Sequence, residues 1–272
     1  MGCPAELIVL GSGTSVPRAD RASSCYLLRC QGTTLLVDLG PGALHRAAAA
    51  GADLDALDGV LLTHIHPDHS ADLVALQFAL MNPATRVGRP PLPVFGHPAM
   101  KLLVSRLRNA WPRWLGADAA RLTLQPVERG SMTLPGGWQA QALPMRHHES
   151  SLGWRLTLPN GATVALSGDT VESPELLELG RDVDLFVLEA AGPDSGPLSG
   201  HLTPRRAGAV GADCGARHLL LTHFYPATLA EPIETLVRET FEGELTLAQD
   251  GQMLSLSPRP DPRQPHPGRA SS

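Results

Sequence analysis

Four potential metal ligands stand within six residues of the 272-residue chain. Imidazole nitrogens and carboxylate oxygens in such a group hold zinc and similar first-row ions, whereas calcium and magnesium prefer oxygen ligands alone. The expected metal is therefore zinc, with Mn²⁺ or Fe²⁺ as alternatives. The four ligands are His64, His66, Asp68 and His69.

The residues around this motif predict where it lies. Residues 59–63 form a short apolar run typical of a strand, and Pro67 suits a helix start better than a helix interior. The motif is thus expected on a strand-to-helix loop, where His64 and His66 can face one ion. Asp68 and His69 then face a neighbouring position, so the spacing predicts two ions. The alternative is a solvated polar loop.

Further candidates occur later in the chain, each at an expected strand end. Only one of the adjacent pair His147 and His148 can easily face a given ion. Asp169 follows a Ser-Gly turn, where a carboxylate can bridge two cations. His223 is preceded by a threonine and an apolar run, which is the arrangement that also precedes His64.

Glu189 and His201 form a second kind of candidate site. Glu189 ends the apolar strand expected over residues 184–189, and His201 precedes a helix that Thr203 and Pro204 are suited to begin. The two side chains could meet at that point.

Composition limits the possible classes of function. A hydrophobic content of 43% is ordinary for a globular core, and a net charge of −5 provides no overall basic field for non-specific nucleic-acid binding. No apolar run approaches a membrane span, and the first residues do not resemble a signal peptide, so a cytoplasmic protein is expected. The cysteines lack a zinc-binding spacing and are interpreted as inert or buried thiols: Cys3, Cys25, Cys30 and Cys214.

One segment departs from this acidic balance. Residues 86–129 contain eight basic residues and two acidic ones. The segment could attract phosphate, or it could be a helix near residues 98–110 with its charges in water. Trp111 and Trp114 alternate with arginines there and could stack on a base, but the simpler interpretation is that they are core contacts.

The remaining sequence predicts alternating strands and helices. Residues 25–30 and 33–38 have the pattern of a hairpin, and Asp38 at its end is either a partner that orients a metal-binding histidine or a plain turn carboxylate. Gly11 and Gly13 follow the first strand, but Val16 at the sixth position and the lack of a helical period argue against a dinucleotide site. Strands are also expected at 6–10, 121–127, 138–143, 153–158, 162–166, 218–222, 244–248 and 252–257. Helices are expected at 43–50, from the metal motif to about residue 80, and at 229–241.

In this order, the candidate ligands resemble those of the metallo-β-lactamase superfamily over residues 6–257. Its phosphodiesterase branch, which includes ribonuclease Z and cyclic phosphodiesterases, is the most similar, on the basis of Gly11–Pro17, Leu36–Asp38 and Gly200–Thr203. The resemblance implies an α/β fold, an αββα four-layer sandwich of two mixed sheets flanked by helices. Residues 1–257 would form the hydrolase domain and residues 258–272 a proline-rich disordered tail.

The resemblance also assigns ligands. His64, His66 and His147 would hold one ion, and Asp169 would bridge it to the other. The second ion would be held by Asp68, His69 and His223. His147 is preferred to His148 because its distance from Gly153-Trp154 is similar to the spacing in the family.

The implied activity is that of a dinuclear metal-dependent phosphodiesterase. A hydroxide bridging the ions would attack phosphorus, Asp68 would orient or deprotonate the water, and His201 held by Glu189 would protonate the leaving group. The expected substrate is a small phosphodiester or RNA, with no stable nucleic-acid or membrane partner and a possible homodimer. The alternatives are tRNA 3′-end processing by ribonuclease Z proper, and hydrolysis of a lactone, thioester or β-lactam.

Two features weigh against other interpretations. His147 and Asp169 are only 22 positions apart, which leaves no room there for the long arm with which ribonuclease Z usually grips tRNA. A di-iron redox relative would typically have a carboxylate in place of His66, and a non-catalytic binding module would not need every ligand position to be filled.

Overall fold

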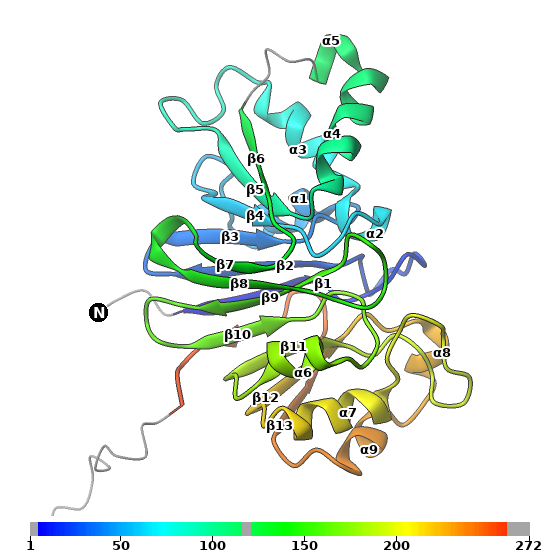
Figure 1. The fold of residues 1–272 in the computed structure, drawn as a ribbon. Coiled ribbons are helices and arrows are strands. Elements are labelled where there is room, and N and C mark those ends of the chain that lie inside the picture. The colour runs from blue at the N-terminus through cyan, green and yellow to red at the C-terminus, as the bar shows by residue number, and fades with distance from the viewer. Residues whose placement is uncertain (1–4, 116–120, 260–272) are drawn as a thin grey trace, which may run out of the picture.

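Two seven-stranded sheets lie face to face between two layers of helices (Figure 1). The computed structural model describes residues 5–115 and 121–259. The first sheet has the order β14-β1-β2-β3-β4-β5-β6. Its strands are β1 Glu6–Gly11, β2 Cys25–Cys30, β3 Thr33–Val37, β4 Gly59–Leu61, β5 Leu92–Gly96, β6 Leu122–Pro126 and β14 Met253–Ser255.

The second sheet has the corresponding order β13-β12-β11-β10-β9-β8-β7. Its strands are β7 Gly130–Thr133, β8 Gln139–Pro144, β9 Leu152–Thr157, β10 Thr163–Leu166, β11 Leu185–Glu189, β12 His218–Thr222 and β13 Glu244–Leu247. Each sheet is antiparallel in one half and parallel in the other, with β3 to β6 parallel in the first and β10 to β13 parallel in the second. Parallel strands end at the same edge of a sheet, so residues that follow them in sequence are brought together.

Helices cover the outer face of each sheet (Figure 1). On the first sheet they are α1 Ala43–Ala49, α2 Pro67–Ser70, α3 Asp72–Leu80, α4 Ala99–Ala110 and α5 Pro112–Leu115. On the second they are α6 Pro174–Gly180, α7 Pro204–Asp213, α8 Pro226–Leu229 and α9 Ile233–Arg238. One apolar cluster fills the space between the sheets, and two others join each sheet to its helices. These three cores confirm the predicted αββα sandwich.

Local sequence explains the β2–β3 hairpin. The two strands are antiparallel, with Tyr26 opposite Val37 and Cys30 opposite Thr33. Gln31 and Gly32 have φ angles of 50° and 83°, the left-handed conformation that a two-residue hairpin turn requires at both positions. The predicted hairpin is confirmed.

Some predicted elements differ in the structure. The helix expected over residues 229–241 is shorter in the structure, where α9 spans Ile233–Arg238 and α8 ends at Leu229. Pro232 separates the two helices, because it cannot donate the backbone hydrogen bond that would continue α8. The helix after the metal motif is divided at Ala71 into α2 and α3. The elements β7 and α6 were not predicted.

The prediction that Trp111 and Trp114 are core contacts was wrong. Their side chains are 48% and 58% exposed, and both line a groove with Phe78 of α3 instead of entering the core. The predicted burial of Cys25, Cys30 and Cys214 is confirmed, whereas Cys3 lies outside the described residues. Of the expected tail, only Pro258 and Arg259 are described.

No helix among residues 5–115 and 121–259 is long and apolar enough to cross a membrane.

Candidate metal centre

The candidate ligands converge at one edge of the sandwich because each follows the end of a strand. His64 lies three residues after β4, His147 three after β8, Asp169 three after β10 and His223 directly after β12. The strands belong to both sheets, so the site lies where the two sheets meet. Residues from 64 to 223 are thereby brought to within a few ångströms of one another.

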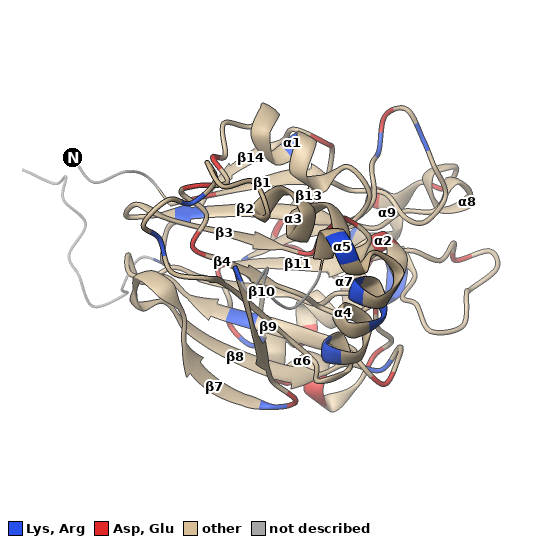
Figure 2. Cartoon of the chain, turned by 90° about the horizontal axis from the view of Figure 1, so that it is seen from above, with Lys and Arg blue, Asp and Glu red and all other residues tan. Residues whose placement is uncertain are grey.

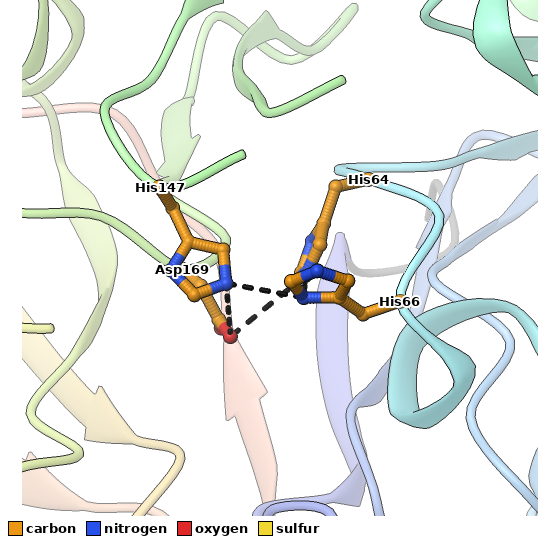
Figure 3. A group of neighbouring side chains, drawn as sticks. All are labelled: His64, His66, His147 and Asp169. Carbon is orange, nitrogen blue, oxygen red and sulfur yellow. Dashed lines mark hydrogen bonds and ion pairs between the residues drawn. The ribbon is translucent and has the colours of Figure 1, made fainter. Parts of the chain in front are cut away.

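The first group of ligand atoms comes from His64, His66, His147 and Asp169, which face one another in Figure 3. Nδ1 of His66 lies 3.1 Å from Nε2 of His64 and 3.1 Å from Nε2 of His147. The Oδ2 atom of Asp169 lies 3.8 Å from Nε2 of His64 and 3.6 Å from that of His147. One atom from each residue lies within 4.8 Å of all the others, a spacing suited to a single ion.

The second group is formed by Asp68, His69 and His223. Oδ2 of Asp68 lies 3.9 Å from Nε2 of each histidine. Asp169 is adjacent to this group too, with Oδ1 3.3 Å from His69 Nε2 and Oδ2 3.3 Å from His223 Nε2. Asp169 therefore lies between the two groups, in a position from which its carboxylate can bridge two cations.

The electrostatics of the centre favour an ionised Asp169 and a neutral His64, whereas for His69 burial is outweighed by Asp169 and Asp38, which raise its pKa well above its ordinary value. Burial would raise the pKa of Asp169, but His223 and His69 outweigh it and hold that pKa well below its ordinary value. Burial, followed by the neighbouring His69, lowers the pKa of His64 well below its usual range. At neutral pH, Asp169 carries a charge and His64 retains a free nitrogen lone pair.

Asp38 and Thr63 contact the rings of two candidate ligands, His69 and His64. Nδ1 of the buried His69 donates to Oδ2 of Asp38 over 2.7 Å, which leaves His69 Nε2 directed at the cluster. The Thr63 N–H donates to Oδ1 of Asp38 over 2.8 Å, and the Thr63 hydroxyl lies 3.1 Å from Nδ1 of His64. Of the two interpretations of Asp38, the orienting partner of a histidine is the one that the structure supports.

The structure places His147, and not His148, in the first group. Nδ1 of His147 donates to the Gly200 carbonyl over 2.9 Å, so Nε2 points into the cluster. Nδ1 of His148 instead lies 2.8 Å from the Ser150 hydroxyl, within its own loop. The spacing shared with the family favoured His147, and these hydrogen bonds give the physical reason why its ring turns inward.

Glu189 and His201 meet beside the cluster. Nδ1 of His201 donates to Oε1 of Glu189 over 2.9 Å, and the His201 ring centroid lies 4.8 Å from that of His147. Glu189 is 1% exposed and also accepts the N–H groups of Thr170, Ala191 and Leu202. Burial lowers the pKa of His201, but the hydrogen bond and charge of Glu189 outweigh it, so the pKa is raised.

Sequence reasoning did not identify two residues at this centre. Thr63 connects Asp38 to His64, and the only signal in the sequence was its place immediately before the motif. Tyr225 lies with its ring centroid 6.1 Å from that of His201 and 6.3 Å from that of His223. Its position two residues after His223 could have indicated this.

The residues present fit divalent cations. Several buried atoms at the centre have no hydrogen-bond partner among the described residues, although polar atoms inside proteins are normally paired. These atoms are Nε2 of His69, Oδ1 of Asp169, and both ring nitrogens of His223. The family fold and these clusters together imply divalent metal ions.

A protein-family model and the sequences of known proteins both match this chain, and they indicate the same family. Residues 33–224 match the model of the beta-lactamase superfamily domain. Ribonuclease Z of Mycobacterium bovis is 30% identical, with 93% of this chain and 99% of the relative covered.

Solved structures agree in fold. The metallo-beta-lactamase fold protein YhfI of Bacillus subtilis superposes with a TM-score of 0.80 at 26% identity, covering 92% of this chain and 98% of that chain. The short form of human tRNase Z superposes with a TM-score of 0.72 at 22% identity, covering 92% and 99%. The chain belongs to the beta-lactamase superfamily, in the branch that includes ribonuclease Z.

Proposed function

We propose that the chain is a metal-dependent phosphodiesterase that uses two divalent cations, with zinc as the expected metal and Mn²⁺ or Fe²⁺ as alternatives. His64, His66 and His147 would hold one cation, and Asp169 would be shared with the other. The second would be held by Asp68, His69 and His223. The relatives named ribonuclease Z and the two ligand groups around one carboxylate support this proposal.

The observation that carries the proposal is the pairing of Glu189 with His201. A histidine with a raised pKa, hydrogen-bonded to a buried carboxylate, is suited to donate a proton. An alkoxide leaving a phosphodiester needs such a proton. Lactone, thioester and β-lactam hydrolysis would use the same ligands but has no comparable need for this pair.

Each residue has a separate task in the reaction. Divalent cations, when bound, supply the Lewis acidity that neutralises phosphate oxygens and makes hydroxide available near pH 7. Asp68, which is less buried than the other carboxylates of the centre, would orient the attacking water. Because Nδ1 of His201 is held by Glu189, its Nε2 proton is the one available to the departing oxygen. General acid catalysis of this kind contributes about 10²–10⁴-fold in rate.

A second candidate function is 3′-end processing of tRNA, which the name of the ribonuclease Z relatives favours. The strands β9 and β10 lie within the 21 residues between His147 and Asp169, so this stretch carries no long insertion. A panel of bis-p-nitrophenyl phosphate, cyclic nucleotides, precursor tRNA and nitrocefin distinguishes the candidates. Hydrolysis of nitrocefin alone would contradict the proposal.

The acid role of His201 predicts a dependence on the leaving group. In His201→Ala, turnover of a phosphodiester with an alkoxide leaving group, such as a cyclic nucleotide, should fall about 10²–10⁴-fold. Bis-p-nitrophenyl phosphate should be affected far less, because p-nitrophenolate departs without a proton. Steady-state kinetics on both substrates, with metal content measured in parallel, checks this.

His218→Ala is the matched control, because His218 lies at the opposite end of β12 and contacts Thr246. It should leave both rates close to those of the unaltered protein. Equal losses on the two substrates in His201→Ala, or loss of a metal ion from it, would contradict the acid role.

A further inference from the structure

The helices α4 and α5 carry a concentration of positive charge that the metal centre does not use. Residues 99–115 contain four basic side chains and no aspartate or glutamate, although the whole chain has a net charge of −5. Lys101, Arg106 and Arg113 are exposed, and Arg108 is partly buried. Among the described residues, no carboxylate lies within ion-pair distance of these four. Figure 2 shows their positive charge on α4 and α5.

Exposed aromatic rings lie beside this charge. Trp111, Trp114 and Phe78 are 48%, 58% and 55% exposed. Phe78 and Trp114 meet edge to face, with ring centroids 6.1 Å apart. They line a groove of about 400 Å³ together with Val74, Ala75 and Leu115. We call these aromatic residues and the basic residues of α4 and α5 the α4–α5 surface.

One end of the α4–α5 surface, the start of α4, lies beside the metal motif, and α5 lies at its other end (Figure 1). Helix α4 begins three residues after β5, and β5 adjoins the start of the metal loop, where Leu62 N–H donates to the Phe95 carbonyl over 2.8 Å. Helix α3 follows α2, which carries Asp68 and His69, and contributes Phe78 to the groove. Both Figure 1 and Figure 2 show α4 beside α2.

We propose that the α4–α5 surface docks a single-stranded nucleic acid, whose end supplies the phosphodiester to the metal centre. Proteins that bind single strands combine a basic track for the phosphates with aromatic side chains on which bases stack. The arginines and the exposed tryptophans of this surface provide both. The inference rests on the proposed phosphodiesterase and names the class of its substrate.

A second copy of the chain fits the surface less well. A twofold dimer would pair the surface with itself, so four basic side chains would face four others. The segment 99–115 has no carboxylate with which to offset that repulsion. A polyanion matches the charge, and flat bases match the exposed indoles.

Binding to a labelled oligonucleotide without metal tests the proposal apart from catalysis. Fluorescence anisotropy of the full chain with a fluorescein-labelled, unstructured 12-nucleotide RNA in EDTA should show saturable binding. Trp111→Ala with Trp114→Ala should weaken it at least fivefold, since stacking on one aromatic ring is worth about 1–3 kcal/mol per base. Trp111→Phe with Trp114→Phe should weaken it less, because phenylalanine still stacks.

The salt dependence provides a second measurement. Arg106→Ala with Arg113→Ala should make the slope of log affinity against log salt shallower by about 1.4, since each phosphate contact on a single strand contributes about 0.7. Arg238→Ala with Arg259→Ala removes the same charge on the second-sheet side and should leave affinity and slope near those of the unaltered protein.

Three results would overturn the docking proposal: no binding by the unaltered chain up to 100 µM, equal weakening by both arginine pairs, or tryptophan variants that become monomeric from a dimer while RNA affinity is unchanged. The last would assign the surface to a second copy. Hydrolysis of bis-p-nitrophenyl phosphate by the unaltered, metal-loaded chain tests the phosphodiesterase separately. Activity there without RNA binding therefore removes this inference alone.

Discussion

Asp169 and Glu189 are both buried carboxylates, but their partners give them different chemistry. Asp169 is 3% exposed, is surrounded by imidazoles and has one oxygen without a hydrogen-bond partner among the described residues. Glu189 is 1% exposed and accepts from three backbone N–H groups as well as from His201. Asp169 therefore has an oxygen available for a cation, whereas both oxygens of Glu189 already accept hydrogen bonds.

The charge of Glu189 predicts a pH effect. Glu189 raises the pKa of His201, and a general acid acts only while protonated, so the rate on an alkoxide-leaving substrate should fall as pH rises through that pKa. Glu189→Gln removes the charge that raises the pKa. The alkaline limb of the kcat/KM profile should therefore move to lower pH. An alkaline limb that stays in place, or moves to higher pH, would contradict the role of Glu189.

At the scale of elements, the site depends on loops that follow strand ends. The sequence predicted these positions because apolar runs ended in His, Asp or Glu at each of them. Other elements gave weaker signals. The strand β7 has the burial pattern of a half-exposed edge, and the short α6 lacks a long apolar repeat, so neither was predicted.

The local sequence pattern also could not predict whether a single side chain is exposed. The spacing of Trp111 and Trp114 is compatible with a buried helix face and with an outward one. Which applies depends on whether another element covers that face, and that is a non-local property. Local pattern alone left both His147 and His148 open, and His147 was preferred only from the family's spacing; the contact that orients it, to the Gly200 carbonyl, comes from 53 residues away.

Gly168 is a test of how the loop before Asp169 is built. Its φ is 58°, and a Cβ there would lie 2.7 Å from the Cβ of Thr63. Gly168→Ala should lower the free energy of unfolding by more than the roughly 1–2 kcal/mol that a left-handed alanine costs. It should also lower the metal content by displacing Thr63. Urea unfolding and metal analysis measure the two effects.

Gly251→Ala is the control, since Gly251 has a φ of 83° and open space around the position of its Cβ. Gly251→Ala should lose only the stability that the left-handed backbone of an alanine costs, and its metal content should not change. Equal losses of stability in the two variants, or full metal content in Gly168→Ala, would show that the contact with Thr63 is unimportant.

At the scale of the whole molecule, the metal loop depends on contact between the sheets. The indole N–H of Trp154 in β9 of the second sheet donates to the Leu62 carbonyl over 3.1 Å, and Leu152 N–H donates to the Thr63 carbonyl over 2.7 Å. The four-layer fold was predictable because the motifs match a family. These contacts were not, because they join residues about 90 positions apart.

Two buried tryptophans allow this contact to be isolated. Trp154→Phe leaves the Leu62 carbonyl without its indole donor. The free energy of unfolding should therefore fall by about 1–3 kcal/mol beyond the decrease caused by the lost packing. Trp138→Phe is the control, because Trp138 is also 0% exposed and its indole nitrogen has no hydrogen-bond partner among the described residues. Denaturant unfolding compares the two, and an equal loss of stability would show that the bond across the sheets contributes little.

We propose a phosphodiesterase with two cations that share Asp169. The most direct test of this proposal is titration of the metal-free chain with Zn²⁺, with bound metal and the initial rate on bis-p-nitrophenyl phosphate measured at each step. The rate should reach its plateau at two ions per chain, and Asp169→Asn should neither bind two ions tightly nor reach that rate. A full rate at one ion per chain, or no phosphodiester hydrolysis at two with Zn²⁺, Mn²⁺ or Fe²⁺, would contradict it.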